Sequence, residues 1–114
     1  MFNNCSVAAL PSASVPAGAF YLGRPWREYA RVVFQASSLS SVINTAGWHI
    51  WNTGDENTEH VYFGEWGNTG LGAASNASSK RAKFSTRLAK PVARDEVLGK
   101  GWGNETWVDR AYIS

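Results

Sequence analysis

The chain has 114 residues, which allows one compact domain and leaves no room for a second. Its 44% apolar content excludes general disorder, and 11 Lys and Arg against 9 Asp and Glu give too little net charge for a nucleic-acid-binding surface. The single cysteine, Cys5, excludes an internal disulfide and a cysteine-based zinc cluster. No apolar run approaches the length of a membrane span, and no export signal is recognisable near Met1.

The first half of the chain predicts two strands. A loop rich in Pro, Ser, Ala and Gly occupies residues 11–19, and Phe20–Leu22 after it reads as a short strand that ends in a turn with Gly23 and Pro25. Arg31–Gln35 combines β-branched and aromatic residues with alternation, so it is the clearest strand, with Val32 and Phe34 expected on one face.

The second half predicts two more strands and little helix. Val61–Glu65 and Arg81–Ser85 repeat the alternating pattern of the first clear strand. Residues 91–98 predict one or two turns of helix, and residues 107–113 predict a last strand or a packed strap. The chain is therefore expected to be mainly β structure.

Two all-β architectures fit these elements. The polar connections at 52–60 and 68–79 are too long for hairpins, which favours a coil of stacked parallel rungs with arms of unequal length. A β-sandwich fits almost as well. Because no internal sequence repeat is visible, periodicity does not decide between them.

Common hydrolase and metal sites are not indicated. There is no G-x-S-x-G motif, and only His49 and His60 are available as bases, so a serine triad is not predicted. The carboxylates between these two histidines lack the spacing of metal ligands and are interpreted as solvated side chains: Asp55, Glu56 and Glu59. No metal site is therefore predicted.

Two further groups of residues have ordinary interpretations. Cys5 is expected to be a packed core residue, because free cysteine is commonly buried and no positive charge lies near it in the sequence. Three N-x-[ST] sequons begin at Asn4, Asn76 and Asn104, and each marks a glycan site only in a secreted protein. Asn76 is the best candidate of the three because it lies in a polar loop.

The stretch Tyr21-Leu-Gly-Arg-Pro-Trp26 is the most informative. Gly23 permits a tight turn and Pro25 fixes the next backbone angle, so Arg24 and Trp26 are presented in defined directions at the end of a strand. An arginine can bind a carboxylate at two points, and a tryptophan offers a flat apolar wall for a sugar ring. A surface arginine beside a core tryptophan in an ordinary turn is the alternative interpretation.

Four segments together carry a resemblance to a known family. They are Tyr21-Leu-Gly-Arg-Pro-Trp26, Tyr29-Ala-Arg-Val-Val33, Val42-Ile-Asn-Thr-Ala-Gly-Trp48 and Phe63-Gly-Glu-Trp-Gly-Asn-Thr-Gly70. In order and spacing they resemble the C-terminal part of pectin methylesterases, above all the fungal branch, and the resemblance runs from about Phe2 to about Tyr112. It implies a right-handed parallel β-helix that removes methyl esters from the galacturonate units of pectin and releases methanol.

The resemblance also implies roles for particular residues. In the family one Asp attacks the ester carbonyl, a second Asp serves as acid and then base, and Gln side chains stabilise the oxyanion without any metal or organic cofactor. By the motif match, Arg24 orients the nucleophilic Asp, Trp26 stacks beside the scissile unit, and Trp48 forms a further wall of the groove.

The family's catalytic Asp and Gln residues lie upstream of the L-G-R-P-W motif, and this chain has no matching motifs there. Asp55, Asp95 and Asp109 occur in contexts that match neither catalytic Asp. We therefore expect residues 1–114 to be the C-terminal rungs of a secreted pectinesterase catalytic domain, truncated on the N-terminal side and inactive alone. A noncatalytic pectin-binding remnant is the alternative. Pectin is the expected partner, without nucleic acid or membrane, and the sequence predicts no oligomeric state.

Overall fold

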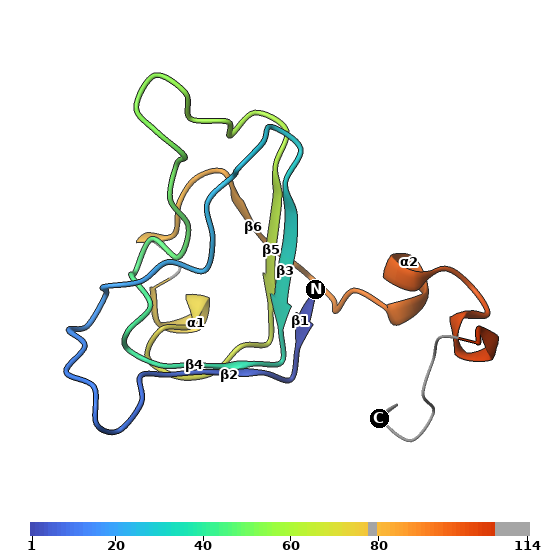
Figure 1. Ribbon diagram of the computed structural model, residues 1–114, viewed down its shortest axis with the longest axis horizontal. Coiled ribbons are helices and arrows are strands. Elements are labelled where there is room, and N and C mark those ends of the chain that lie inside the picture. The colour runs from blue at the N-terminus through green and yellow to red at the C-terminus, as the bar shows by residue number, and fades with distance from the viewer. Residues whose placement is uncertain (78–79, 107–114) are drawn as a thin grey trace.

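The computed structural model describes residues 1–77 and 80–106, and in them the chain winds into a coil of stacked rungs (Figure 1). One four-stranded sheet has the order β1-β3-β5-β6, and a second sheet pairs β2 with β4. All of these pairs are parallel. The strands are β1 (Phe2–Asn3), β2 (Ser6–Val7), β3 (Arg31–Gln35), β4 (Ser38–Leu39), β5 (Tyr62–Trp66) and β6 (Ser85–Arg87). The predicted all-β, right-handed parallel β-helix is confirmed, and the β-sandwich is wrong because neighbouring strands come from successive turns.

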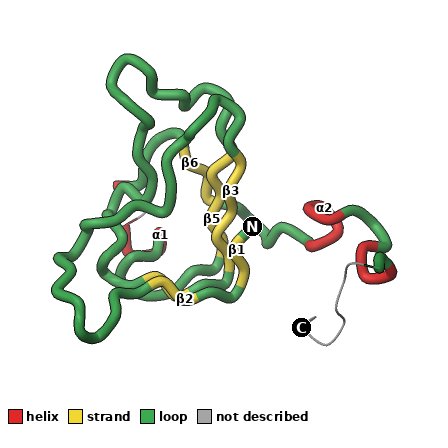
Figure 2. Tube along the Cα trace, viewed as in Figure 1, coloured by secondary structure: helices red, strands yellow, loops and turns green. Residues whose placement is uncertain are grey.

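The third side of the coil is held by isolated bridges rather than by long strands. Phe20 pairs with Ile43 and Gly23 pairs with Trp48, both in parallel. The arms between these fixed points differ in length, since the segment from Ser6 to Phe20 is much longer than its counterpart from Ser38 to Ile43. Loops accordingly make up most of the cross-section in Figure 2.

The corner after the main sheet is built the same way in the rungs of β1, β3 and β5. Asn3 pairs with Gln35 and Gln35 with Trp66, so the residues that follow them occupy equivalent positions. These residues, Asn4, Ala36 and Gly67, have φ values of 56°, 48° and 61°. A left-handed backbone at the same position of these three rungs turns the chain by a similar amount, which keeps them in register.

Polar side chains tie the rungs together just beyond this corner. The Cys5 amide donates to Ser37 Oγ at 3.0 Å, and the Ser37 amide donates to Asn68 Oδ1 at 3.0 Å. Asn68 Nδ2 in turn donates to the Phe34 carbonyl at 3.0 Å. Cys5 is therefore a half-buried rung residue, less enclosed than the expected core position, and its Sγ donates to the Asn3 carbonyl.

An aromatic stack crosses the rungs, buried at Phe34, Trp48 and Phe63 and 48% exposed at its end residue, Phe2. Phe2 stacks on Phe34 with a ring-centroid distance of 4.5 Å, and Trp48 stacks on Phe63 at 4.4 Å. Phe34 meets Trp48 edge-on, which joins the two pairs. Leu39, Phe63 and Ala73 have no exposed surface. Burying large apolar side chains in this way supplies the main stabilisation of the coil.

The C-terminal segment lies outside the main sheet, where Figure 1 shows α2 (Arg94–Leu98). The Gln35 side chain donates to the Val92 carbonyl at 3.1 Å and accepts from the Val92 amide at 2.9 Å. The expected placement of Val32 and Phe34 on one face of β3 is confirmed, because both pack in the core cluster. Val33 on the opposite face is also buried, since the C-terminal segment around Val92 lies against that face. The described residues also include α1 (Ala74–Ala77) and the 3-10 helix η2 (Trp102–Asn104).

The strand predictions had mixed outcomes. The strand at Arg31–Gln35 is confirmed as β3, and the one at Val61–Glu65 is found one residue later as β5. The strand expected at Phe20–Leu22 is reduced to the Phe20 bridge, and the one at Arg81–Ser85 is wrong because β6 begins only at Ser85.

Two predictions concern the C-terminal part of the chain. The helix expected within residues 91–98 is confirmed as α2. The expected strand or strap at 107–113 lies outside the described residues. Within the described ranges, no helix has the length and apolarity needed to cross a bilayer.

Candidate functional site

A sharp turn presents the residues of the Leu-Gly-Arg-Pro-Trp segment. Leu22 donates its amide to the Gly47 carbonyl at 2.7 Å, and the Gly23 carbonyl accepts from the His49 amide at 3.2 Å. A Cβ on Gly23 would lie 3.1 Å from the Trp48 ring, so a glycine lets the turn sit directly against that ring. Pro25 is buried and anchors the turn, and the residues on either side of it, Arg24 and Trp26, are exposed.

Trp26 is an exposed aromatic surface beside this anchor. Its side chain is 67% exposed, and its ring meets the Trp51 ring edge-on with the centroids 4.8 Å apart. A cavity of about 380 Å³ opens next to it, lined by Trp26, Arg27, Glu28, Tyr29, Asp55 and Asn57. A flat ring at the mouth of a polar cavity is suited to stacking against a sugar.

Arg24 is exposed and lies over an aromatic ring. Its guanidinium carbon is 5.7 Å from the centroid of Tyr21, and Tyr21 in turn meets His49 edge-on at 4.8 Å. Among residues 1–77 and 80–106, no carboxylate forms an ion pair with Arg24. The planar fork of this side chain is thus available to an incoming carboxylate.

Trp48 does not lie where the sequence placed it. Its side chain is 1% exposed, stacks on Phe63, and donates from Nε1 to Glu65 Oε2 at 3.1 Å. A ring covered in this way offers no face to a ligand, so the expectation that Trp48 forms a groove wall disagrees with its burial. The Gly23 bridge explains its position, because this bridge lays the turn over the outer side of the Trp48 ring.

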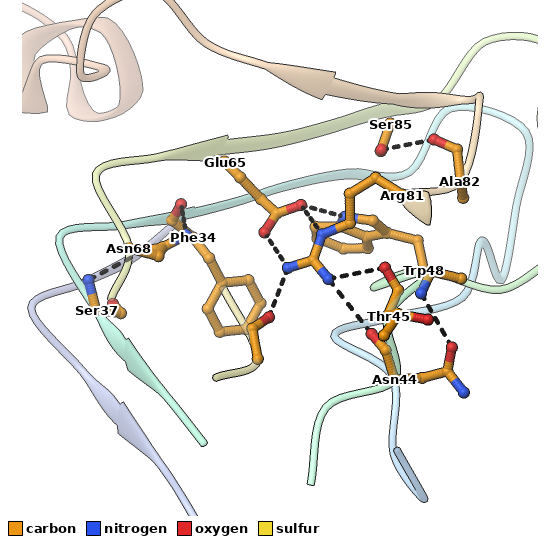
Figure 3. A network of polar contacts seen from close by, with 12 residues as sticks. Phe34, Ser37, Asn44, Thr45, Trp48, Glu65, Asn68, Arg81, Ala82 and Ser85 are labelled. Atoms are coloured by element: carbon orange, nitrogen blue, oxygen red, sulfur yellow. Dashed lines mark hydrogen bonds and ion pairs between the residues drawn. The ribbon is translucent and has the colours of Figure 1, made fainter. Parts of the chain in front are cut away.

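A buried ion pair lies beneath Trp48 and was missed by sequence reasoning (Figure 3). Arg81 Nη2 lies 2.8 Å from Glu65 Oε1 and Arg81 Nε lies 3.0 Å from Glu65 Oε2, a two-point contact between side chains that are 7% and 3% exposed. The remaining N–H groups of Arg81 donate to the carbonyl groups of Asn44, Thr45 and Gly72.

This ion pair is completely saturated. All five guanidinium N–H groups have acceptors, and in the described part of the chain every buried side-chain nitrogen or oxygen atom has a hydrogen-bond partner. Gly47 is required beside it, since a Cβ there would lie 2.7 Å from Arg81 Nε. A buried pair whose arginine has no free donor holds the rungs together and offers no guanidinium N–H group to a substrate. One available signal was the charged Glu65 inside an otherwise apolar strand.

The other titratable candidates are not assembled into a site. His49 Nδ1 lies 2.8 Å from the Ile50 carbonyl, while the exposed His60 stacks on Tyr29. Asp95 accepts from Trp102 Nε1 at 2.9 Å on the outer segment. Within residues 1–77 and 80–106 no three His, Cys, Asp or Glu residues are grouped as metal ligands. Asp109 lies outside the described residues.

The sequons are also distributed differently from the expectation. Asn4 occupies the left-handed corner and is exposed, and Asn104 is exposed at the end of η2. Asn76, expected in a polar loop, lies in α1.

Comparison with known proteins gives a consistent result. The sequence model of the pectinesterase family, described as "Pectinesterase", matches residues 1–96. A pectinesterase of Aspergillus niger is 46% identical over 100% of this chain and 33% of its own length, and one of Aspergillus aculeatus is 44% identical over 99% of this chain and 32% of its own. The crystal structure of the pectin methylesterase from Aspergillus niger in deglycosylated form superposes with a TM-score of 0.79, at 37% identity, over 97% of this chain and 33% of that one. The chain thus spans about a third of the length of these relatives.

Proposed function

Because the chain belongs to the pectinesterase family, we propose that residues 1–114 form the C-terminal portion of a catalytic domain that hydrolyses methyl esters of pectin outside the cell. The observation that carries this proposal is the pairing of an uncommitted guanidinium with an exposed tryptophan on one buried proline anchor. Arg24 has no ion-pair partner among the described residues, whereas Arg81 has every N–H group occupied.

The chemistry that fits this pair is attack by a carboxylate on an ester. A carboxylate nucleophile forms a bond to the ester carbonyl carbon, the C–O bond to the methoxy group breaks, and methanol leaves with a proton from a second acid. Water then cleaves the acyl–enzyme bond and regenerates both groups. In the proposed site Arg24 holds the nucleophilic carboxylate at two points, which fixes its attack line, and Trp26 supports the sugar ring.

We assign the nucleophile to a residue outside this chain. Asp55 is exposed in the 51–60 loop and Asp95 is bonded to Trp102 on the outer segment, so neither is paired with Arg24. The 114 residues alone are therefore expected to release no methanol from methylated pectin. Turnover within about tenfold of a full-length relative would contradict this, since removal of a covalent nucleophile costs orders of magnitude in kcat.

The role of Arg24 is tested by joining the first two-thirds of the Aspergillus niger pectinesterase to this chain in place of its own matching third. Replacing Arg24 with Lys keeps the charge and loses the fork, so kcat should fall by at least about tenfold. Arg87→Lys, on an exposed arginine of β6 that does not line the cavity beside Trp26, is the matched control and should leave kcat unchanged. A normal kcat in Arg24→Lys with an intact circular dichroism spectrum would remove the positioning role.

A noncatalytic pectin-binding role is the second candidate, favoured by the exposed Trp26 at its polar cavity. It predicts that the joined protein has no esterase activity while the chain alone still binds methyl-esterified galacturonan. The two candidates are thus separated by methanol release from the joined protein.

A further inference from the structure

The 51–60 loop projects from the coil and returns against the Arg24-Pro25-Trp26 turn. Figure 1 shows it in green, extending well beyond the cross-section of the rungs. Its first half closes on itself: the Trp51 amide donates to the Glu56 carbonyl at 3.2 Å, and Asn52 and Asp55 exchange two backbone hydrogen bonds. The Gly54 amide also donates to Glu56 Oε1 at 2.7 Å. These bonds make the first half of the loop a preformed hairpin.

Asn57 connects this hairpin to the turn. Its side-chain nitrogen donates to the Pro25 carbonyl at 3.3 Å and to the Trp26 carbonyl at 3.4 Å, so one amide group contacts two consecutive carbonyl groups of the turn. The backbone of Asn57 has a φ of 59°, a left-handed conformation that asparagine tolerates better than most residues. The residue type thus fits both the backbone and the contact.

Two aromatic pairs flank Asn57, one at each end of the loop. At the start, Trp51 meets Trp26 edge-on with an interplanar angle of 74°. At the end, His60 stacks on Tyr29 with centroids 4.8 Å apart and an angle of 7°. The segment from Pro25 to Tyr29 is therefore held at three points by one loop, and the cavity beside Trp26 lies between them.

We propose that the 51–60 loop is a positioning element that sets the orientation of the Trp26 ring for a methyl-esterified galacturonan, with Asn57 as its central residue. This inference rests on the proposed function for its ligand and on the three contacts above for its geometry. Trp26 is 67% exposed and receives no covering layer, so the loop contacts are what restrict its ring. A ring held in place before binding loses less conformational freedom when the sugar stacks on it.

Asn57→Asp and Asn57→Gly test the amide in the 114-residue chain itself. Aspartate keeps the size and tolerance of the left-handed backbone but replaces the donor with an acceptor, and glycine keeps only the backbone. Thr53→Asp, in the exposed hairpin, is the control for added negative charge. We expect both Asn57 variants to lose the nuclear Overhauser contacts between the Trp26 and Trp51 rings, with the melting temperature within about 2 °C of the parent for a surface change.

The second measurement is a titration with a methyl-esterified hexagalacturonate, followed by the indole resonance of Trp26. Both Asn57 variants should bind about threefold to tenfold more weakly than the parent, and Thr53→Asp should bind as the parent does. Unchanged ring contacts, or unchanged affinity with altered contacts, would overturn the inference. Absence of binding by the parent chain would instead count against the proposed substrate, while the ring contacts alone would still decide whether Asn57 positions Trp26.

Discussion

The structure contains two arginine–tryptophan groups with opposite surroundings. Arg81 and Trp48 both bind Glu65 inside the coil, where every polar atom is paired and the tryptophan is 1% exposed. Arg24 and Trp26 lie on the surface turn, where the tryptophan is 67% exposed and the arginine lies over the face of Tyr21 without an ion pair to any described residue. The two groups are adjacent, because Gly23 of the turn lies on the Trp48 ring.

This difference separates residues that stabilise the fold from residues available for function. The same two side-chain types serve as a cross-link between rungs in one place and as an open surface in the other. Which role they take is decided by the carboxylate: Glu65 is supplied by β5 for Arg81, and none of the described residues supplies one for Arg24. Stability measurements should therefore respond to the first group and ligand measurements to the second.

The largest expected effect comes from breaking the inner group. Arg81→Ala leaves Glu65 buried and unpaired and should lower the free energy of unfolding by about 3–5 kcal/mol, measured by urea denaturation. Arg24→Ala should change it by less than about 0.5 kcal/mol, as a surface substitution.

If Arg81→Ala fails to fold, the double variant Glu65→Met with Arg81→Met tests whether the unpaired charge of Glu65 is the cause. Removing both charges should restore much of the stability that one removal costs. A loss of less than about 1 kcal/mol in Arg81→Ala is smaller than the usual cost of an uncompensated buried charge. It would show that the two arginines contribute similarly to stability, which contradicts the distinction drawn between the two groups.

Substituting the buried tryptophan should also lower the free energy of unfolding more than substituting the exposed one, although the difference is smaller than for the two arginines. Trp48→Phe removes the N–H that Glu65 accepts and leaves unfilled volume, so the free energy of unfolding should fall by about 2–3 kcal/mol. Trp26→Phe should stay within about 0.5 kcal/mol of the parent. Equal losses in urea denaturation would show that the exposed ring is also part of the packed structure.

Gly23 is the point where the two groups meet. A Cβ there would lie 3.1 Å from the Trp48 ring, so Gly23→Ala should cost about 1–2 kcal/mol through overpacking. Gly103→Ala, with open space around its Cβ position, is the control and should be nearly neutral by thermal unfolding. A neutral Gly23→Ala would indicate that the turn moves independently of the buried group.

The smallest effect is expected at a corner that belongs to neither group. Ala36 has a φ of 48°, so Ala36→Gly relieves a left-handed strain and should raise the free energy of unfolding by about 0.5 kcal/mol, after the entropic cost of glycine. Ser38→Gly in β4, an ordinary strand position, should lower it instead. A loss in Ala36→Gly similar to that in Ser38→Gly would show that the corner carries no strain.

The sequence predicted those parts of the fold that depend on local pattern. β3 was found where alternation and β-branched residues placed it, because its own side chains suffice to make it a strand. Arg81–Ser85 has the same alternation, yet Arg81 is taken up by Glu65 from β5, and a strand forms only after that contact. Contacts between distant segments of this kind leave no periodic trace in the sequence.

The candidate site was predictable only in part for a related reason. Arg24 and Trp26 could be recognised because Gly23 and Pro25 define a turn within four residues. The groove-wall role of Trp48 was taken from the family resemblance, and its burial could not be read from the local sequence because the Gly23 turn that covers it is distant along the chain. Asn57 was not identified, since one asparagine in a polar loop is unremarkable until its contacts with Pro25 and Trp26 are seen.

The unequal arms of the coil have a practical consequence for engineering. Register is fixed at the sheets, at the repeated corner and at the Phe20 and Gly23 bridges. In the arm between Val7 and Phe20, Ala9 and Val15 pack against the core and Gly18 is hydrogen-bonded to Ser41 and Asn44, whereas residues 10–14 are exposed. The exposed tip at residues 10–14 can therefore be shortened, or replaced by a foreign peptide, without removing a core contact or shifting a paired strand. It is therefore a natural insertion point for an affinity tag or a reporter, on a segment separate from the turn that carries Arg24 and Trp26.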